Sequence, residues 1–238
     1  MKGPAFAALV LWLAAAPASA LDYFTLALTW HPALCRRLPQ AAGCSPRARK
    51  ALVLHGLWPE KTGDRQHSFA YCGAAANKRK FEQPGAWCSL PALELSAQAS
   101  DDLDGSMPGR ASCLDRHEWQ KHGTCSGLSA ENYFSMAHQL TLRFSATKLG
   151  RYLSAKAGKT VTAKSLISEF ESEFGPGSRA ALNFYCRDVG GAVLLNEIKF
   201  YLTAGLRPEH PLKSLLARPD AWQRGDCPAS FLIAEPNR

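Results

Sequence analysis

The chain has 238 residues, of which 46% are hydrophobic and 20% are charged, and its formal net charge is +8 at pH 7. No repeat, low-complexity segment or linker interrupts the sequence, and this length can bury the core of a single domain. The surplus of basic residues favours a polyanionic partner and predicts binding that weakens with salt.

The first twenty residues have the pattern of a secretory signal peptide. Lys2 supplies a positive start, residues 5–16 form an apolar stretch, and Ala18-Ser19-Ala20 matches an A-x-A cleavage site. We therefore expect cleavage after Ala20, a mature catalytic domain over residues 21–238, and a periplasmic or secreted location. The apolar stretch is short for a membrane span, and no later segment reaches the necessary length, so we expect no membrane partner.

Two short strands are predicted next. Residues 23–30 alternate aromatic residues with β-branched or small ones, and residues 51–58 begin with an apolar run that is typical of a buried strand. The apolar run over residues 51–54 leads into the sequence His55-Gly56-Leu57-Trp58-Pro59-Glu60. Gly56 and Pro59 break the regularity there and expose side chains, although one histidine after a strand is only a modest signal by itself.

The middle of the chain contains an unusual density of ionisable residues. Residues 72–110 are rich in Gly, Pro and Ser, with a predicted helix over residues 91–103. A second helix is predicted after Cys113, where Asp115 can serve as N-cap. This helix carries the run His117-Glu118-Trp119-Gln120-Lys121-His122-Gly123-Thr124-Cys125.

Four ionisable side chains of this run share one face of the predicted helix. At about 100° per residue they span about 140°, whereas Trp119 points roughly the opposite way, toward a core. Two imidazoles that exchange protons near neutral pH, beside an anion and a cation, form a general acid–base device. A solvated helix face more often shows Glu/Lys pairs without histidine. The four residues are His117, Glu118, Lys121 and His122.

The same run has a competing interpretation as a zinc site. Zinc peptidases carry the signature H-E-x-x-H, which places two ligands one helical turn apart. Here the spacing is H-E-x-x-x-H, so the imidazoles of His117 and His122 diverge and Lys121 stands between them. A cation at that position opposes Zn²⁺ binding. A zinc-dependent hydrolase is therefore disfavoured, and a measurement of metal content would discriminate between the two interpretations.

The second half of the sequence supplies elements for the core. Residues 130–144 and 163–174 place Leu, Met and Phe side chains at helical spacing, and Gly175-Pro176-Gly177 ends the second helix. Residues 181–186 and 193–202 are predicted as two sheet strands joined by a short turn. Helices and strands in this order predict a single α+β domain.

The two histidine segments together resemble the active-site segments of a known enzyme family. The strings H-G-L-W-P at residues 55–59 and H-E-W-x-K-H-G-T-C at residues 117–125 are similar to the two active-site motifs of the ribonuclease T2 family of secreted endoribonucleases, in the same order. Weaker similarities are Trp30-His31-Pro32 followed by Cys35, and Met107-Pro108-Gly109. The resemblance implies an α+β domain with a central antiparallel sheet, flanked by helices and stapled by disulfides.

The resemblance also implies a role for each ionisable residue. RNA carries its own nucleophile, the ribose 2′-OH beside the scissile phosphodiester. His122 would be the general base that takes its proton, and His55 the general acid that protonates the leaving 5′-oxygen. Lys121 and Glu118 would stabilise the transition state, and His117 would bind phosphate. The implied enzyme is a lyase that cleaves RNA through 2′,3′-cyclic phosphates to 3′-phosphate ends and needs no metal or other cofactor.

Two further residues would contact the RNA base. Trp58 is an aromatic platform on which an unpaired base can stack, with ordinary core filling as the alternative. Glu60 stands where the family often has Asp in contact with the base, and Leu114 and Asp115 replace the usual aromatic residues before the second motif. These departures leave the base preference open, and we expect low or relaxed base specificity.

Eight cysteines in an exported chain indicate disulfides, although their spacing alone does not choose the pairing. The C-x-x-C pairs that zinc ribbons need are absent from the sequence. By resemblance to the family, we expect the pairs Cys35–Cys44, Cys72–Cys125, Cys88–Cys113 and Cys186–Cys227.

A catalytically inactive RNA-binding or cell-toxic relative is a third interpretation, which the intact catalytic positions disfavour. We expect single-stranded RNA as the partner and a monomeric protein. DNA is expected to bind weakly and to remain uncleaved, because it lacks the 2′-OH. The biological role of the cleavage stays open at this level.

Overall fold

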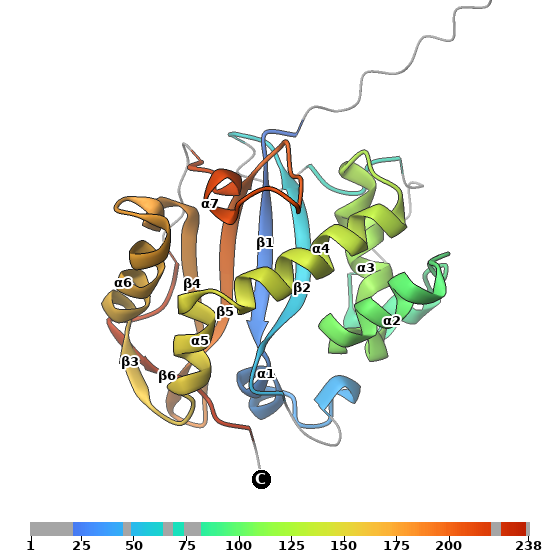
Figure 1. Cartoon of the computed structure of the whole chain (residues 1–238). Coiled ribbons are helices and arrows are strands. Elements are labelled where there is room, and N and C mark those ends of the chain that lie inside the picture. The colour runs from blue at the N-terminus through green and yellow to red at the C-terminus, as the bar shows by residue number, and fades with distance from the viewer. Residues whose placement is uncertain (1–20, 45–48, 64–68, 74–81, 220–224, 237–238) are drawn as a thin grey trace, which may run out of the picture.

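The structure is a computed structural model that describes residues 21–44, 49–63, 69–73, 82–219 and 225–236 (Figure 1). The predicted signal peptide lies outside the described residues. The helices are α1 (His31–Arg37), α2 (Ala97–Ser106), α3 (Leu114–Lys121), α4 (Ala130–Ser145), α5 (Lys148–Ala155), α6 (Ala163–Phe174) and α7 (Leu212–Leu215). No helix in these ranges combines the length and the apolar composition that crossing a bilayer requires.

The strands form one six-stranded sheet. They are β1 (Tyr23–Trp30), β2 (Leu52–Glu60), β3 (Thr160–Thr162), β4 (Leu182–Val189), β5 (Ala192–Thr203) and β6 (Ser230–Leu232). Their order is β2-β1-β5-β6-β3, with β4 also paired to β5. The pairings are antiparallel except for β5 and β6, which run parallel where Leu194 meets Leu232. The predicted α+β class is confirmed, with a mixed sheet in place of a purely antiparallel one.

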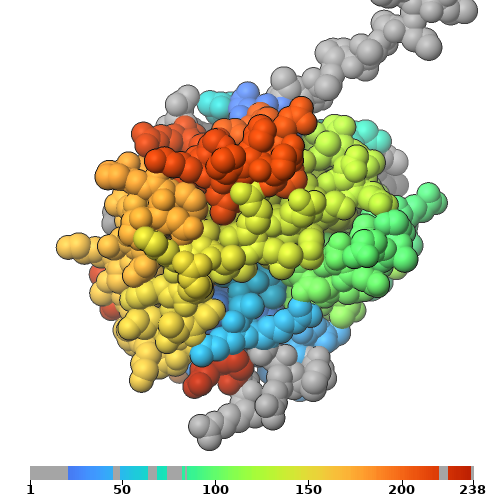
Figure 2. All heavy atoms as spheres, in the orientation of Figure 1, coloured from blue at the N-terminus to red at the C-terminus, as the bar shows by residue number. Residues whose placement is uncertain are grey.

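One face of the sheet carries the main core. Leu26, Leu57 and Phe200 are cross-strand neighbours on this face, and none of them is exposed to solvent. Helices α4 and α5 cross the same face, and their side chains cover it in the space-filling view (Figures 1 and 2). The ring of Phe144 on α4 stacks on Phe200 at 4.2 Å. Burial of each large apolar side chain contributes about 1.5–3 kcal/mol, so this layer holds the strands in place.

A tyrosine on α4 fixes β2 from the core side. The buried Tyr133 hydroxyl donates a hydrogen bond to the carbonyl oxygen of Leu57 at 2.6 Å. Trp119 of α3 packs edge-on against the Tyr133 ring, with 5.8 Å between centroids. Trp119 therefore points toward the core, as the helical spacing predicts, and the opposite face of α3 is left for the ionisable residues.

Two helix starts differ from the sequence predictions. Helix α2 begins at Ala97, because Ser96 is its N-cap and accepts a hydrogen bond from the backbone of Ala99. The predicted N-cap role of Asp115 is wrong. The N-cap of α3 is Cys113, in the left-handed conformation, and Asp115 lies in the first turn. Helices α1 and α5 were not predicted.

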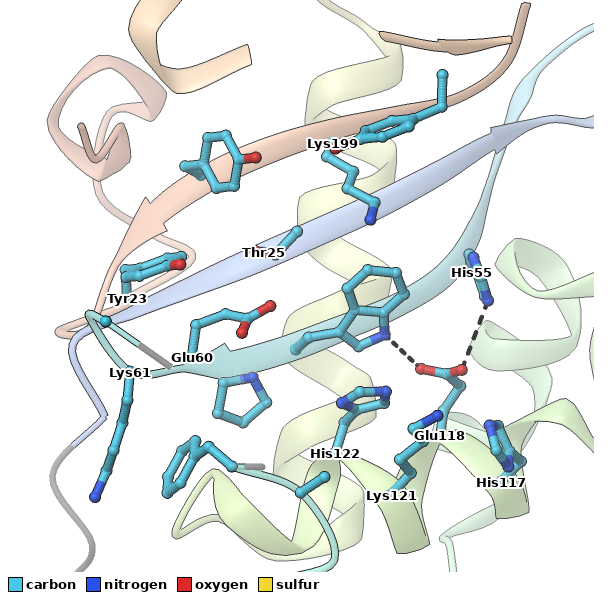
Figure 3. Close-up of a pocket in the computed structure, with 17 residues that line it drawn as sticks. Tyr23, Thr25, His55, Glu60, Lys61, His117, Glu118, Lys121, His122 and Lys199 are labelled. Carbon is cyan, nitrogen blue, oxygen red and sulfur yellow. Dashed lines mark hydrogen bonds and ion pairs between the residues drawn. The ribbon is translucent and has the colours of Figure 1, made fainter. Parts of the chain in front are cut away.

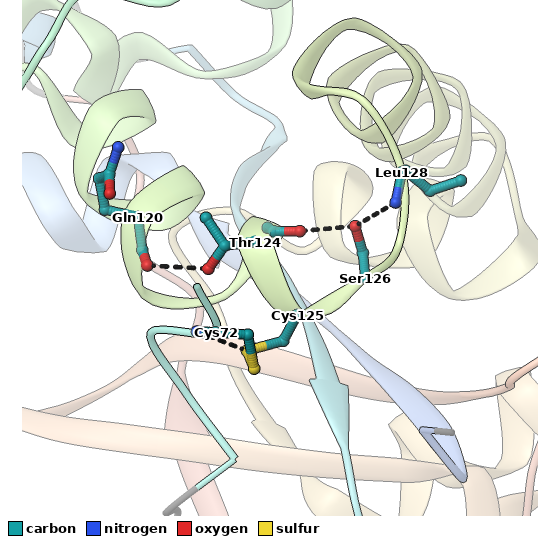
Figure 4. Close-up of a disulfide and its surroundings, with 7 residues drawn as sticks. Cys72, Gln120, Thr124, Cys125, Ser126 and Leu128 are labelled. Carbon is teal, nitrogen blue, oxygen red and sulfur yellow. Dashed lines mark hydrogen bonds between the residues drawn. A yellow bond between two sulfur atoms is a disulfide. The ribbon is translucent and has the colours of Figure 1, made fainter. Parts of the chain in front are cut away.

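Four disulfides connect the described cysteines in the pairs that the family resemblance implies: Cys35–Cys44, Cys72–Cys125, Cys88–Cys113 and Cys186–Cys227. Figure 4 shows the bridge between Cys72 and Cys125, which joins the segment after β2 to the turn after α3. Next to it, the backbone N–H of Tyr71 donates to the carbonyl oxygen of Lys121 at 2.8 Å. The second segment of the chain that carries a histidine motif is thus tied to the first.

Candidate active site

A pocket of about 400 Å³ lies on the face of the sheet away from α4, between α3 and the strands β1, β2 and β5 (Figure 3). Figure 3 shows most of its ionisable residues at one end, and Glu60, Tyr23 and Lys61 at the other. The lining includes all seven catalytic or substrate-binding residues predicted from the sequence: His55, Trp58, Glu60, His117, Glu118, Lys121 and His122.

A β-bulge turns His55 into this pocket. Ala27 of β1 pairs with Gly56, but the next residue of β1 pairs with Leu54, so His55 is an extra residue on β2. In a regular strand, residues three apart face opposite sides, and His55 and Trp58 could not both line one pocket. The bulge breaks the alternation, and both side chains reach the same face. His55 therefore keeps a partly exposed side chain between buried residues of the strand.

Gly56 allows β2 to approach α3 closely. A Cβ atom at this position would lie 2.0 Å from Oε2 of Glu118 and 2.3 Å from Nε1 of Trp58. Any side chain would therefore displace the contact between these two groups. The glycine of the first motif is required by this approach rather than by a turn.

Glu118 is the buried centre of the site. The indole Nε1–H of Trp58 donates to its Oε2 at 2.7 Å, and Nε2 of His55 lies 3.7 Å from its Oε1. Burial raises the pKa of Glu118, although the charges of His55 and Lys121 and the hydrogen bond from Trp58 oppose this shift. A carboxyl group in this environment retains a proton more readily than an exposed one.

All three histidines of the site lie against aromatic rings. His122 directly follows α3 and stacks on Trp58, with ring centroids 5.2 Å apart. His55 meets the same indole edge-on at 5.3 Å, so the two imidazoles lie around one tryptophan. His117 is buried and stacks on Trp87 at 4.7 Å.

Lys121 supplies a cation at the rim of the pocket. Its Nζ lies 4.0 Å from a carboxylate oxygen of Glu82, and both side chains are partly exposed. An exposed ion pair of this length contributes little free energy, so the ammonium group can turn toward an anion in the pocket.

Two charged residues of β5 complete the site and were not singled out from the sequence. Oε2 of Glu197 lies 2.6 Å from Nδ1 of His55. Nζ of Lys199 lies 4.5 Å from the ring centroids of both Trp58 and Tyr185. A usable signal exists in the sequence, because the charged residues Glu197 and Lys199 alternate with apolar residues in a mostly apolar strand.

The sequence profile of the Ribonuclease T2 family matches residues 21–210. The chain belongs to the ribonuclease T2 family. It is therefore an endoribonuclease of this family, as the two motifs predict. Ribonuclease I of Escherichia coli is 27% identical over 234 residues, which cover 89% of this chain and 85% of that protein. A ribonuclease of Aeromonas hydrophila is 32% identical over 161 residues, which cover 67% of this chain and 64% of that protein.

Solved structures of ribonucleases share the fold of this family member. The SF11-RNase of Nicotiana alata superposes with a TM-score of 0.63 at 18% identity, covering 90% of this chain and 100% of that one. Ribonuclease MC1 from bitter gourd seeds superposes with a TM-score of 0.60 at 20% identity, covering 89% of this chain and 99% of that one. Variants of ribonuclease MC1 have been crystallised with 5′-GMP and 5′-UMP.

Proposed function

We propose that this ribonuclease T2-family enzyme cleaves single-stranded RNA through attack of the ribose 2′-OH on the adjacent phosphodiester, without a metal ion. One observation carries the proposal: the imidazoles of His55 and His122, from separate elements, lie around Trp58 in a single pocket. In-line displacement needs a base on one side of the phosphorus and an acid on the other. Two histidines on different elements can meet that requirement.

The two histidines take opposite parts in the first step. Neutral His122 accepts the proton of the 2′-OH as the 2′-oxygen bonds to phosphorus. The bond from phosphorus to the 5′-oxygen breaks, and that oxygen takes a proton from His55. Burial lowers the pKa of His55, but the hydrogen bond and charge of Glu197 and the charge of Glu118 outweigh it, so the net pKa is raised. This direction supports the acid role of His55.

Three neighbours stabilise the crowded, negatively charged phosphorane. Lys121 contributes a positive charge, and His117 binds a phosphate oxygen. Glu118 acts through the acid, because its carboxylate lies 3.7 Å from Nε2 of His55 and favours the positively charged imidazolium. Water then attacks the 2′,3′-cyclic phosphate with the histidine roles reversed, and the product is a 3′-phosphate.

The base of the RNA is proposed to contact Trp58 and Glu60, with low or relaxed base specificity. The Trp58 ring already lies against His122 and Lys199. A base that stacks on the indole must therefore displace one of these contacts. Homopolymer digestion with product analysis measures the resulting preference.

The chemistry is tested by digestion of single-stranded RNA in excess EDTA, followed by mass spectrometry of the RNA ends. We expect undiminished cleavage, 2′,3′-cyclic phosphates as the first products, and 3′-phosphates that appear more slowly. Single-stranded DNA should bind weakly and remain intact. Cleavage that stops with the chelator and leaves 5′-phosphates, or hydrolysis of DNA, would contradict the mechanism and favour a metal-dependent one.

The proposal places the enzyme outside the cytoplasm as a monomeric mature chain of residues 21–238, after cleavage behind Ala20. The signal pattern at the N-terminus supports export. All eight cysteines are paired in disulfides, which persist in oxidising compartments. Sequencing of the N-terminus of the exported protein tests the cleavage site.

A further inference from the structure

We propose that Glu197 is a positioning residue for the general acid: its carboxylate holds the His55 ring through Nδ1, so that Nε2 delivers the proton in the pocket. Glu197 lies on β5, outside both histidine motifs. The inference rests on the acid role proposed above for His55.

The contact between His55 and Glu197 lies where β-bulges interrupt two strands of the sheet. His55 is the extra residue of the bulge on β2. On β5 the extra residue is Asn196, because Tyr185 pairs with Glu197 and the next residue of β4 pairs with Leu195. Bulges commonly occur beside active sites, where they change the direction of a side chain. The bulge on β2 brings His55 to the pocket face, whereas Glu197 keeps its regular pairing with Thr29 of β1 and lies next to the bulge on β5.

Small residues on the strand between them let the two side chains meet. Strand β1 separates β2 from β5, so the backbones of His55 and Glu197 are about 10 Å apart. The β1 residues in register with this region are Ala27 and Thr29, which leave space above the strand. Across that space, Oε2 of Glu197 lies 2.6 Å from Nδ1 of His55.

The contact fixes which nitrogen of His55 exchanges its proton. A carboxylate accepts hydrogen bonds, so Nδ1 carries a hydrogen in both charge states of the ring. Nε2 is then the nitrogen that gains and loses a proton, and it lies 3.7 Å from Glu118 in the pocket. The Glu197 side chain is only 11% exposed, so solvent screens its charge little.

The charged groups that face His55 are Glu118 from α3 and Glu197 and Lys199 from β5. Burial and Lys199 lower the pKa of His55, and the two carboxylates raise it. Burial raises the pKa of Glu197, but His55 and Lys199 outweigh burial and hold it below the usual value, so Glu197 is charged at neutral pH. Without the charge of Glu197, Glu118 is the one remaining group of these three that raises the pKa of His55 against the effect of burial.

The test compares Glu197→Gln with Glu197→Asp and with the control Glu131→Gln. Glu131 also accepts hydrogen bonds, from Ser96, but lies outside the pocket. An acid must be protonated, so activity falls as the pH rises through the pKa of His55. We expect Glu197→Gln to move this alkaline limb of kcat down by about one pH unit or more, with KM within about twofold. Glu197→Asp keeps the negative charge, so its alkaline limb should lie close to that of the wild type. Glu131→Gln should match the wild type.

NMR titration of the His55 Cε1–H signal, assigned with His55→Phe, separates this inference from the proposed function. We expect the His55 pKa to fall in Glu197→Gln by the same amount as the kinetic limb. An unchanged His55 pKa in a folded Glu197→Gln protein would overturn the role of Glu197. A lowered His55 pKa with an unmoved alkaline limb would instead overturn the acid role of His55.

Discussion

At the scale of single residues, the site separates two chemically identical side chains by their surroundings. His55 lies close to the carboxylates of Glu118 and Glu197, which favour its protonated form. His122 stacks on the indole of Trp58. The raised pKa of His55 suits a general acid, because this histidine must carry a proton when the reaction begins.

We expect His55→Phe and His122→Phe each to lower kcat by about a thousandfold or more, because each removes a proton-transfer step. Lys121→Ala removes only charge stabilisation and should cost about 10²-fold. Initial rates on single-stranded RNA measure the effect, and circular dichroism confirms the fold. Near-wild-type turnover in both histidine variants, with unchanged spectra, would show that the chemistry lies elsewhere.

At the scale of elements, the site depends on how closely β2 approaches α3. Gly56→Ala places a methyl group within 2.0 Å of the Glu118 carboxylate. We expect a loss of about 1–3 kcal/mol in the free energy of unfolding, because the two elements must separate. We also expect at least tenfold lower kcat, since Glu118 and Trp58 move together.

The matched control is Gly105→Ala on α2, where an added Cβ meets no atom within 4 Å. Urea denaturation and kcat are measured for both variants. Equal behaviour of Gly56→Ala and Gly105→Ala would mean that the approach of β2 to α3 is not a constraint on the enzyme.

The elements also show what the sequence can and cannot predict. The strand pattern of residues 23–30 and the helix face of residues 117–122 follow from periodicity, and both are found in the structure. Glu197 was missed because its partner is distant in the sequence and its strand is interrupted by a bulge. Periodicity has no signal for an extra residue, and it would place His55 and Trp58 on opposite faces of the strand. The motif, rather than the pattern, identified that histidine.

At the scale of the whole molecule, the disulfides hold together segments that lie far apart in the chain. Cys72 and Cys125 are 53 residues apart and connect the segment after the first motif to the end of the second motif. Replacing both by serine should lower the free energy of unfolding by about 2–4 kcal/mol. It should also lower kcat, because α3 loses a restraint near Lys121 and His122.

The control for this variant replaces Cys35 and Cys44, a bridge with a separation of only 9 residues. It should cost less stability and leave kcat within about twofold. Thermal denaturation and initial rates are measured on both double variants. If the two lose activity equally, the bridge between Cys72 and Cys125 has no special link to the site.

The bulge at His55 makes the enzyme sensitive to the number of residues in β2 as well as to their identity. Deleting His55, the one residue between Leu54 and Gly56, would restore regular pairing with β1 and remove the side chain that reaches both Glu118 and Glu197. Outside His55, Gly56 and Trp58, homologous chains can therefore exchange side chains along this strand, whereas an insertion or deletion at the bulge displaces the general acid. Length variation in active members of the family should fall in the connecting loops instead.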